Sequence, residues 1–227
     1  MSVLAIDTAH AAVSACIMGA DGVVRASETV PMTRGHSEVL LPLVERVRSA
    51  AGVEFADLSR VGCIVGPGSF TGIRIGISAA RAIGLASGIP VIGVASLPAL
   101  AAPLIGNDSG YVIAAAIDAK HGQVYVQGFS AKGHSVLPPR IAKVRDAVRA
   151  LGAGPIRLVG SGAAMMAIEA WSMGMEADVI ADAASPEIAF VARLALLADP
   201  AQAPARPFYL KAPDAQPQSR GLIARAT

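Results

Sequence analysis

The sequence predicts an α/β protein in which one unit, three strands followed by alternating helices and strands, is used twice. A buried strand at 2–7 is followed by two more short strands, an opening that an ordinary doubly wound sheet would not need. The opening recurs in the second half, and residues of the two halves match at one constant spacing: Ile6 with Ile117, Asp7 with Asp118, His10 with His121, Val13 with Val124 and Gly22 with Gly133. Element order and spacing together describe duplicated ribonuclease-H-like lobes, the architecture of the sugar-kinase, Hsp70 and actin (ASKHA) group.

Residues 1–105 are expected to form the N-terminal lobe. Alternating or continuous apolar runs indicate its strands, the Asp21-Gly22 pair indicates a hairpin turn, and longer periodic segments indicate helices. The expected elements are, in order, strands 2–7, 12–18 and 23–30, helix 36–51, strand 61–65, the glycine-rich loop 66–72, helix 70–87, strand 89–94 and a short helix from Ser96.

Residues 106–200 are expected to form the C-terminal lobe. Its last helix has a clear start signal, because Ser185-Pro186-Glu187 offers an N-cap, a proline at the first position and an acid in the first turn. The expected elements are strands 111–118 and 123–130, a turn at Lys132-Gly133, strand 156–159, helix 162–172, strand 178–181 and helix 186–198.

Residues 201–227 are rich in Pro, Ala and Gln and are expected to form an extended C-terminal tail. Within the tail, Pro207-Phe208-Tyr209-Leu210 gathers the large apolar side chains. We therefore expect this stretch to dock the tail onto the folded lobes.

The composition indicates a buried sheet and a surface that a partner covers. Hydrophobic residues make up 53% of the chain, charged residues 16%, and the mean hydropathy is +0.54, yet no apolar run approaches the length of a membrane helix, ~20 residues. The net charge is +2 without a Lys/Arg cluster, so the chain has no electrostatic footprint for binding nucleic acid unaided. Cys16 and Cys63 fall in expected strands as buried free thiols. The N-terminus lacks a secretion signal, and we expect a cytoplasmic protein without membrane attachment.

The nucleotide site of this architecture is only weakly represented. ATP-using members place an Asp and a Gly/Ser/Thr-rich turn in the first hairpin of each lobe, where backbone N–H groups bind phosphate. Asp7 is followed by Thr8-Ala9 without a glycine, and Asp118 by Ala119-Lys120 without a hydroxyl. We favour a role for both carboxylates in fixing strand ends. Gly160 and Gly162, in a strand–helix loop, fit an adenosine site or an ordinary tight turn equally well.

The loop Gly66–Gly72 is not a P-loop, because it lacks the terminal Gly-Lys-Ser/Thr. The helix after it carries small residues four apart: Gly72, Gly76, Ala80, Gly84 and Gly88. Glycine inside a helix costs up to ~1 kcal/mol relative to alanine, so such a ridge indicates that another backbone approaches closely. The approaching element is either a partner's helix or the protein's own sheet.

The first long helix has an apolar surface wider than one core stripe. Leu40, Leu43, Val44 and Val47 form the stripe, while Leu41 lies about a third of a turn away. Pro42 is expected to kink the helix or to mark its true first turn. A metal pair of His-x-x-x-His type is absent, because His36 is followed four residues later by Leu40.

Several strings together resemble the bacterial TsaB/YeaZ family. They are Leu4-Ala5-Ile6-Asp7-Thr8, Arg34-Gly35-His36-Ser37-Glu38 with Leu40-Leu41-Pro42, Gly66–Gly76, Gly93-Val94-Ala95-Ser96-Leu97, Ile117-Asp118-Ala119 with Val124-Tyr125, and Tyr209-Leu210-Lys211 with Pro213-Asp214-Ala215. The likeness extends over most of the chain, and the GPGSFTG string at 66–72 is its most specific part.

The resemblance implies a catalytically silent dimerisation subunit. Such a subunit would act with TsaD, a catalytic paralogue that keeps a metal-binding His-x-x-x-His, and with TsaE, a small P-loop ATPase. TsaC would supply threonylcarbamoyl-AMP, and the product is N6-threonylcarbamoyladenosine, 3′ of the anticodon in tRNAs that read ANN codons. The chain would then touch tRNA only indirectly, hold no metal or cofactor of its own, and leave open a nucleotide at the junction with the partner.

The resemblance also places the partner surface on helices 36–51 and 70–87, with a homodimer through the same surface when the partner is absent. The contact residues expected there are His36, Leu40, Leu41, Val44, Thr71, Gly72, Arg74, Ile75, Gly76 and Ala80. Two enzymatic alternatives compete with this hypothesis. An ATP-dependent small-molecule kinase would need intact phosphate loops, which Ala9 and Ala119 disfavour, and a glycoprotease-type peptidase would need the metal ligand that Leu40 replaces.

Overall fold

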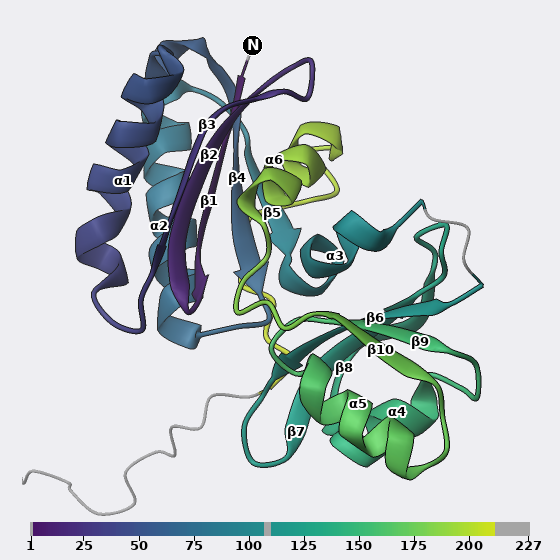
Figure 1. Ribbon diagram of the computed structural model, residues 1–227. Coiled ribbons are helices and arrows are strands. Elements are labelled where there is room, and N and C mark those ends of the chain that lie inside the picture. The colour runs from purple at the N-terminus through teal and green to yellow at the C-terminus, as the bar shows by residue number, and fades with distance from the viewer. Residues whose placement is uncertain (1, 107–109, 212–227) are drawn as a thin grey trace, which may run out of the picture.

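Two five-stranded sheets with equivalent strand orders confirm the predicted duplication (Figure 1). The protein is seen here in a computed structural model that describes residues 2–106 and 110–211. The first sheet has the order β3-β2-β1-β4-β5 and the second the order β8-β7-β6-β9-β10, so each strand of one lobe has its counterpart in the other. The first two strands of each lobe pair antiparallel, and the first and fourth pair parallel. The duplicated ASKHA architecture is therefore confirmed.

The first sheet consists of β1 (Ser2–His10), β2 (Ala12–Gly19), β3 (Val24–Pro31), β4 (Leu58–Gly66) and β5 (Val91–Ala95). Helices α1 (His36–Ala51) and α2 (Phe70–Ser87) cover one face of this sheet. A 3₁₀ turn, Phe55–Asp57, leads into β4. Helix α1 continues through Pro42 and begins at His36, so the alternative that Pro42 marks its first turn is wrong.

The second sheet consists of β6 (Val112–Asp118), β7 (Gln123–Phe129), β8 (Ser135–Lys143), β9 (Ile156–Val159) and β10 (Ala177–Ala181). Helices α4 (Val144–Ala150) and α5 (Ala163–Ser172) pack together on one of its faces. The sequence patterns above did not reveal β8 and α4. Strand β8 contains Pro138-Pro139, which a central strand would not tolerate, but β8 lies at the sheet edge, where a missing N–H breaks no second ladder.

The two remaining helices are exchanged between the lobes. Helix α6 (Ile188–Leu197) packs on β1, β2 and β4 of the first sheet, opposite α1 and α2, and joins the first core through Val191 and Ala195. Helix α3 (Ser96–Ala101), continued by the 3₁₀ turn Ala102–Leu104, buries Leu97 and Leu100 against the second sheet. The predicted lobe boundaries of 1–105 and 106–200 are therefore wrong for these two helices.

A close approach between α6 and β4 explains why α6 packs on the first sheet. Gly62 in β4 has no side chain where Ala195 of α6 lies, since a Cβ there would be 2.5 Å from the Cβ of Ala195. Helix α6 also begins later than predicted. Its N-cap residue is Glu187, whose side chain makes no capping hydrogen bond. Ser185 and Pro186 instead line a second cavity between the lobes, so tertiary packing overrides the local start signal.

The tail is docked as predicted over its described part. Gly93 N–H donates to Ala203 (2.9 Å), Ile92 bridges to Pro204, and Phe208 N–H donates to the Val65 carbonyl oxygen (2.7 Å). Residues 203–208 thus run along the outer edge of β5 and back to β4. Residues 212–227, including the predicted Pro213-Asp214-Ala215, lie outside the described residues.

Both cysteines are buried in the first sheet, as predicted, and this sets their reactivity. Burial raises the pKa of Cys63 to about 12 and that of Cys16 to about 11. Because the thiolate is the reactive form, we expect neither thiol of the folded protein to react with a disulfide reagent at pH 8 within an hour, and both to react in guanidinium. A thiol that reacts rapidly in the native protein would contradict this packing.

Candidate functional site

The two predicted carboxylates occupy equivalent positions at the ends of β1 and β6. Asp7 accepts the N–H of Ala9 (2.7 Å), and Asp118 accepts the N–H of Lys120 (2.7 Å), so each carboxylate closes the turn that follows it. The second oxygen of each is also occupied, by His10 Nδ1 (2.9 Å) in the first lobe and by Lys120 Nζ (2.8 Å) in the second. This geometry agrees with the favoured interpretation that both residues fix strand ends.

The two carboxylates differ in their surroundings. Asp7 is 1% exposed, whereas the side chain of Asp118 keeps 26% of its surface in solvent. The hydrogen bond from Lys120 holds the pKa of Asp118 below its usual value, and the Asp118 amide donates to Ser161 Oγ (3.2 Å). The second-lobe corner is therefore an ionised, internally paired cluster.

Gly160 and Gly162 pack against the second sheet. A Cβ at Gly160, whose φ is 101°, would meet the carbonyl oxygen of Ala116, and a Cβ at Gly162 would lie 3.0 Å from Val124. The Gly162 N–H donates to the same carbonyl oxygen (3.0 Å). Of the two interpretations left open for this loop, close strand–helix packing accounts for both glycines without a ligand.

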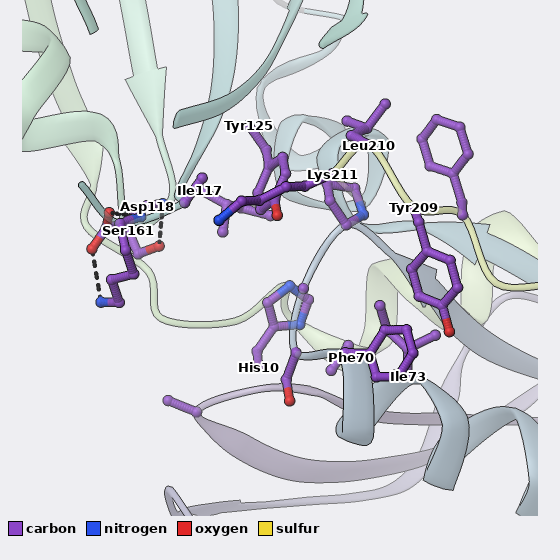
Figure 2. Close-up of a pocket in the computed structure, with 18 of the residues that line it drawn as sticks. His10, Phe70, Ile73, Ile117, Asp118, Tyr125, Ser161, Tyr209, Leu210 and Lys211 are labelled. Carbon is purple, nitrogen blue, oxygen red and sulfur yellow. Dashed lines mark hydrogen bonds and ion pairs between the residues drawn. The ribbon is translucent and has the colours of Figure 1, made fainter. Parts of the chain in front are cut away.

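A cleft of about 490 Å³ lies between the lobes, and both hairpin ends open into it (Figure 2). Most of its lining comes from the β1–β2 turn with His10, the start of α2, the end of β6 and the docked tail, and Tyr125, Ser161 and Ala184 complete it. In Figure 2, Asp118 and Ser161 stand at one end, Phe70 and Tyr209 at the other, and His10 lies between them, facing Tyr125 and Lys211. Of the two predicted carboxylates, Asp118 lines the cleft, whereas Asp7 reaches it only through its hydrogen bond to His10. The sequence marked His10 only as a repeat position that matches His121, and Lys211 only within the strings that carry the resemblance.

The small-residue ridge of α2 faces the protein's own sheet. A Cβ at Gly72 would overlap the carbonyl oxygen of Thr8, and one at Gly76 would lie 2.8 Å from Thr8 Oγ1, which itself donates to the carbonyl oxygen of Gly72 (2.7 Å). Gly84 packs against Val91, and Gly88 is the left-handed C-cap of the helix. The ridge therefore exists because β1 and β5 approach α2, not because a partner's helix does.

Half of the predicted partner contacts are consequently wrong. These residues are buried in the first lobe's core: Leu40, Val44, Gly72, Gly76 and Ala80. Periodicity identifies an apolar helix face but not what covers it, and here the sheet covers it. The other predicted contacts keep exposed surface, with Leu41 at 57%, Thr71 and Arg74 exposed and Ile75 half-buried.

His36 has a structural partner. Its Nε2–H donates to the carbonyl oxygen of His10 (3.0 Å), which ties the first turn of α1 to the β1–β2 turn. Within residues 2–106 and 110–211, no three His, Cys, Asp or Glu side chains gather in a way that would hold a metal ion. In the same ranges, no helix is long and apolar enough to cross a membrane.

An aromatic cluster at the start of α2 extends the exposed helix surface. The rings of Phe70 and Tyr209 stack with centroids 4.9 Å apart, and the guanidinium of Arg74 lies 3.9 Å above Phe70 while its Nε donates to Tyr209 Oη (3.2 Å). Phe70 is 37% and Tyr209 38% exposed. The docking stretch 207–210 was the signal for Tyr209, but nothing in the sequence paired it with Phe70.

The matching family model and the curated relatives named TsaB concern one tRNA modification, threonylcarbamoyladenosine. Residues 28–204 match the model of the family described as "TsaD: tRNA N6-adenosine threonylcarbamoyltransferase". The chain is 39% identical, over 126 residues, to the tRNA threonylcarbamoyladenosine biosynthesis protein TsaB of Escherichia coli, a match that covers 55% of this chain and 53% of that protein. The chain thus spans about half the length of the curated relatives it matches.

Solved structures extend the likeness over the whole fold. YeaZ from Pseudomonas aeruginosa superposes with a TM-score of 0.72 at 25% identity, covering 92% of this chain and 99% of that one. Component A of the (R)-2-hydroxyglutaryl-CoA dehydratase of Acidaminococcus fermentans has a TM-score of 0.51 at 11% identity, covering 87% of this chain and 97% of that one, and shows the shared fold alone.

Proposed function

Since this chain belongs to the TsaB/YeaZ family, within the wider TsaD family, we propose that it is a non-catalytic subunit in the biosynthesis of threonylcarbamoyladenosine in tRNA. In this role it pairs with a TsaD-like catalytic paralogue, and a TsaE-like ATPase completes the assembly. The paralogue, not this chain, carries the metal and transfers the threonylcarbamoyl group from threonylcarbamoyl-AMP to N6 of the adenosine 3′ of the anticodon.

The proposal of a silent subunit rests on two carboxylates whose oxygens all accept hydrogen bonds within the protein. In both lobes the Asp at the hairpin end already accepts the amide two residues later and a neighbouring side chain, Asp7 with His10 and Asp118 with Lys120. A kinase of this architecture needs these turns to offer N–H groups to phosphate and a carboxylate to orient metal-bound water. Both functions would require the present hydrogen bonds to be given up.

The partner surface of this proposal is the outer face of α1 and α2 near their N-terminal ends. Leu41 supplies an exposed aliphatic side chain, and Phe70, Arg74 and Tyr209 supply stacked rings and a guanidinium. Aromatic residues and arginine are the types that dominate binding energy at protein interfaces. A homodimer of this chain through the same face, two-fold symmetric, would cover it when the partner is absent.

Reconstitution tests the proposal directly. TsaD, TsaE, tRNA and threonylcarbamoyl-AMP are combined with and without this chain, and modified adenosine is counted by mass spectrometry after nuclease digestion. We expect modification only when this chain and TsaD are both present, and none from this chain with TsaE alone. Modification by this chain in the absence of TsaD would make it the enzyme.

The carboxylates give a second test. We expect Asp118→Ala to leave turnover of the reconstituted complex within about threefold of wild type, whereas removing a group that acts in the transition state costs about 100-fold or more. Asp7→Asn is the companion variant, because the amide oxygen can still accept the buried Ala9 N–H, which Asp7→Ala would leave without an acceptor. A 100-fold loss in either variant, with the complex intact by gel filtration, would contradict the silent role.

A further inference from the structure

One buried nitrogen in the cleft has no partner. His10 is 9% exposed, and its side chain only 4%, yet its Nε2 makes no hydrogen bond to any residue that the structure describes. The ring is held from its other side, because Nδ1–H donates to Asp7 Oδ2 (2.9 Å). Figure 2 shows the free edge of the ring turned toward the cavity, between the Asp118–Ser161 end and the Phe70–Tyr209 end.

The tautomer follows from the partner of Nδ1. An ionised carboxylate only accepts, so the proton of the Nδ1–Asp7 contact belongs to the histidine. When the ring carries a second proton, that proton is on Nε2 and points into the cleft, while Asp7 balances the charge of the imidazolium. In the neutral ring Nε2 is therefore an acceptor without a donor, and it becomes a donor only when the ring takes up a second proton. An anionic oxygen favours that second proton, because it accepts from Nε2–H.

The start of α2 lies against the same cavity and favours the same charge. Gly68, Ser69 and Phe70 line the cleft, and the 18-residue helix α2 begins at Phe70. The first N–H groups of a helix have no acceptor within it and form the positive end of its dipole, which attracts anions. Ser69 Oγ satisfies the Gly72 N–H from outside (3.2 Å) and does not neutralise that end.

The carboxylate in the lining does not oppose an anion. Asp118 is paired with Lys120 at 2.8 Å, so its negative charge is offset within the protein. Ile73, Ile117, Phe208 and Leu210 give the cleft an apolar wall, beside the hydroxyl groups of Tyr125, Ser161 and Tyr209. At about 490 Å³ the cleft is larger than a simple inorganic ion and has room for an organic body.

We propose that this cleft binds a small organic oxyanion, a carboxylate or phosphate ester with an apolar body, whose head group accepts from His10 Nε2–H at the start of α2. The body lies along the apolar wall beneath the docked tail. The site belongs to this chain alone and goes beyond the proposed role as a silent subunit, because it requires neither tRNA nor a catalytic partner.

The test is a titration of the isolated chain followed by NMR of the histidine rings. The probes are phenyl phosphate and benzoate, which separate phosphate from carboxylate, inorganic phosphate, which lacks the body, and benzyl alcohol, which lacks the charge. We expect the Nε2 resonance of His10 to move to its protonated position with saturating phenyl phosphate or benzoate. Inorganic phosphate should bind about tenfold more weakly, and benzyl alcohol should not move the resonance.

A matched pair of variants identifies the nitrogen. His10→Gln should lower the affinity for phenyl phosphate or benzoate, whichever binds better, by about tenfold or more, as expected for loss of a hydrogen bond to a charged group. His121→Gln, at the duplicated and exposed position of the second hairpin, should change affinity by less than about twofold.

Three results would overturn the proposal. They are an unmoved His10 ring in the wild-type protein at saturation, equal binding of benzyl alcohol and phenyl phosphate, or equal affinity of His10→Gln and wild type. The first needs no variant, so a misfolded His10→Gln cannot hide the answer. Because no partner is present, any of these results would leave the proposed subunit role unaffected.

Discussion

Leu41→Glu is expected to weaken binding of a TsaD-like partner by about 30-fold or more. Leu41 is 57% exposed on α1, beside the core stripe of Leu40 and Val44, and its loss removes no buried contact of the free chain. A glutamate at the centre of a dry interface would be buried without a counter-charge, and truncation at a central interface position commonly costs about 2 kcal/mol or more. The effect should therefore appear in binding and not in folding.

Isothermal titration of TsaD with each variant measures this effect. Ile168→Glu is the matched control, since Ile168 is 64% exposed on α5 of the second lobe, away from α1 and α2. We expect the control to bind within about twofold of wild type. If Leu41→Glu binds normally while Ile168→Glu does not, the partner surface lies on the second lobe.

The same variant reports on self-association. If one face serves both the homodimer and the heterodimer, Leu41→Glu should sediment as a monomer, and wild-type homodimer should dissociate as TsaD is added in analytical ultracentrifugation. A ternary species that retains the homodimer would show that two different surfaces are used. Ala80→Arg cannot serve this purpose, because Ala80 is fully buried against the sheet and the change would disrupt folding.

Gly72→Ala is expected to lower the free energy of unfolding by about 2 kcal/mol or more. In isolation, alanine in a helix is favoured over glycine by up to ~1 kcal/mol, so helix propensity predicts the opposite sign. The tertiary contact decides, because the new Cβ would overlap the Thr8 carbonyl oxygen and lie 3.2 Å from the Ala9 Cα. Backbone atoms of a central strand cannot move aside as a side chain would, and overpacking of this kind typically costs about 1–3 kcal/mol and occasionally more.

Thermal unfolding followed by circular dichroism would measure this change. Ser78→Ala, at an exposed position of the same helix, isolates the propensity term and should leave stability within about 0.5 kcal/mol of wild type. Equal stability of Gly72→Ala and wild type would mean that α2 does not pack on β1 through its glycines.

Most helices, strands and turns of this fold could be predicted, because each depends on residues that lie close together in the chain. The opening hairpin, helices 36–51 and 70–87, and the buried cysteines all follow from periodicity and turn residues, and the structure places them within a few positions of the prediction. The duplication was visible because Asp7 and Asp118 repeat together with their neighbours. Strand β8 was missed because Pro138-Pro139 disfavours a strand unless the position at the sheet edge is known.

Some residues of the candidate site were indicated by the sequence, and others became apparent only in the structure. Asp7 and Asp118 stand out in the sequence because the architecture gives them a position, whereas His10 appears there only as a match to His121, with no sign that it faces a cavity. Its importance depends on what faces Nε2, and that is set by α2, the tail and the second lobe together. The pairing of Phe70 with Tyr209 likewise joins residues far apart in the chain.

The sequence by itself thus predicted the duplication and most of the strands and helices, since these follow from periodicity and from a repeated unit. Only the tertiary structure decided which surface covers each apolar helix face. Helix α6 belongs in sequence to the second half but packs on the first sheet, and the ridge of α2 serves β1 instead of a partner. An amphipathic pattern states how much apolar surface must be buried, whereas the choice among several apolar surfaces depends on close fit, here Gly62 against Ala195 and Gly72 against Thr8.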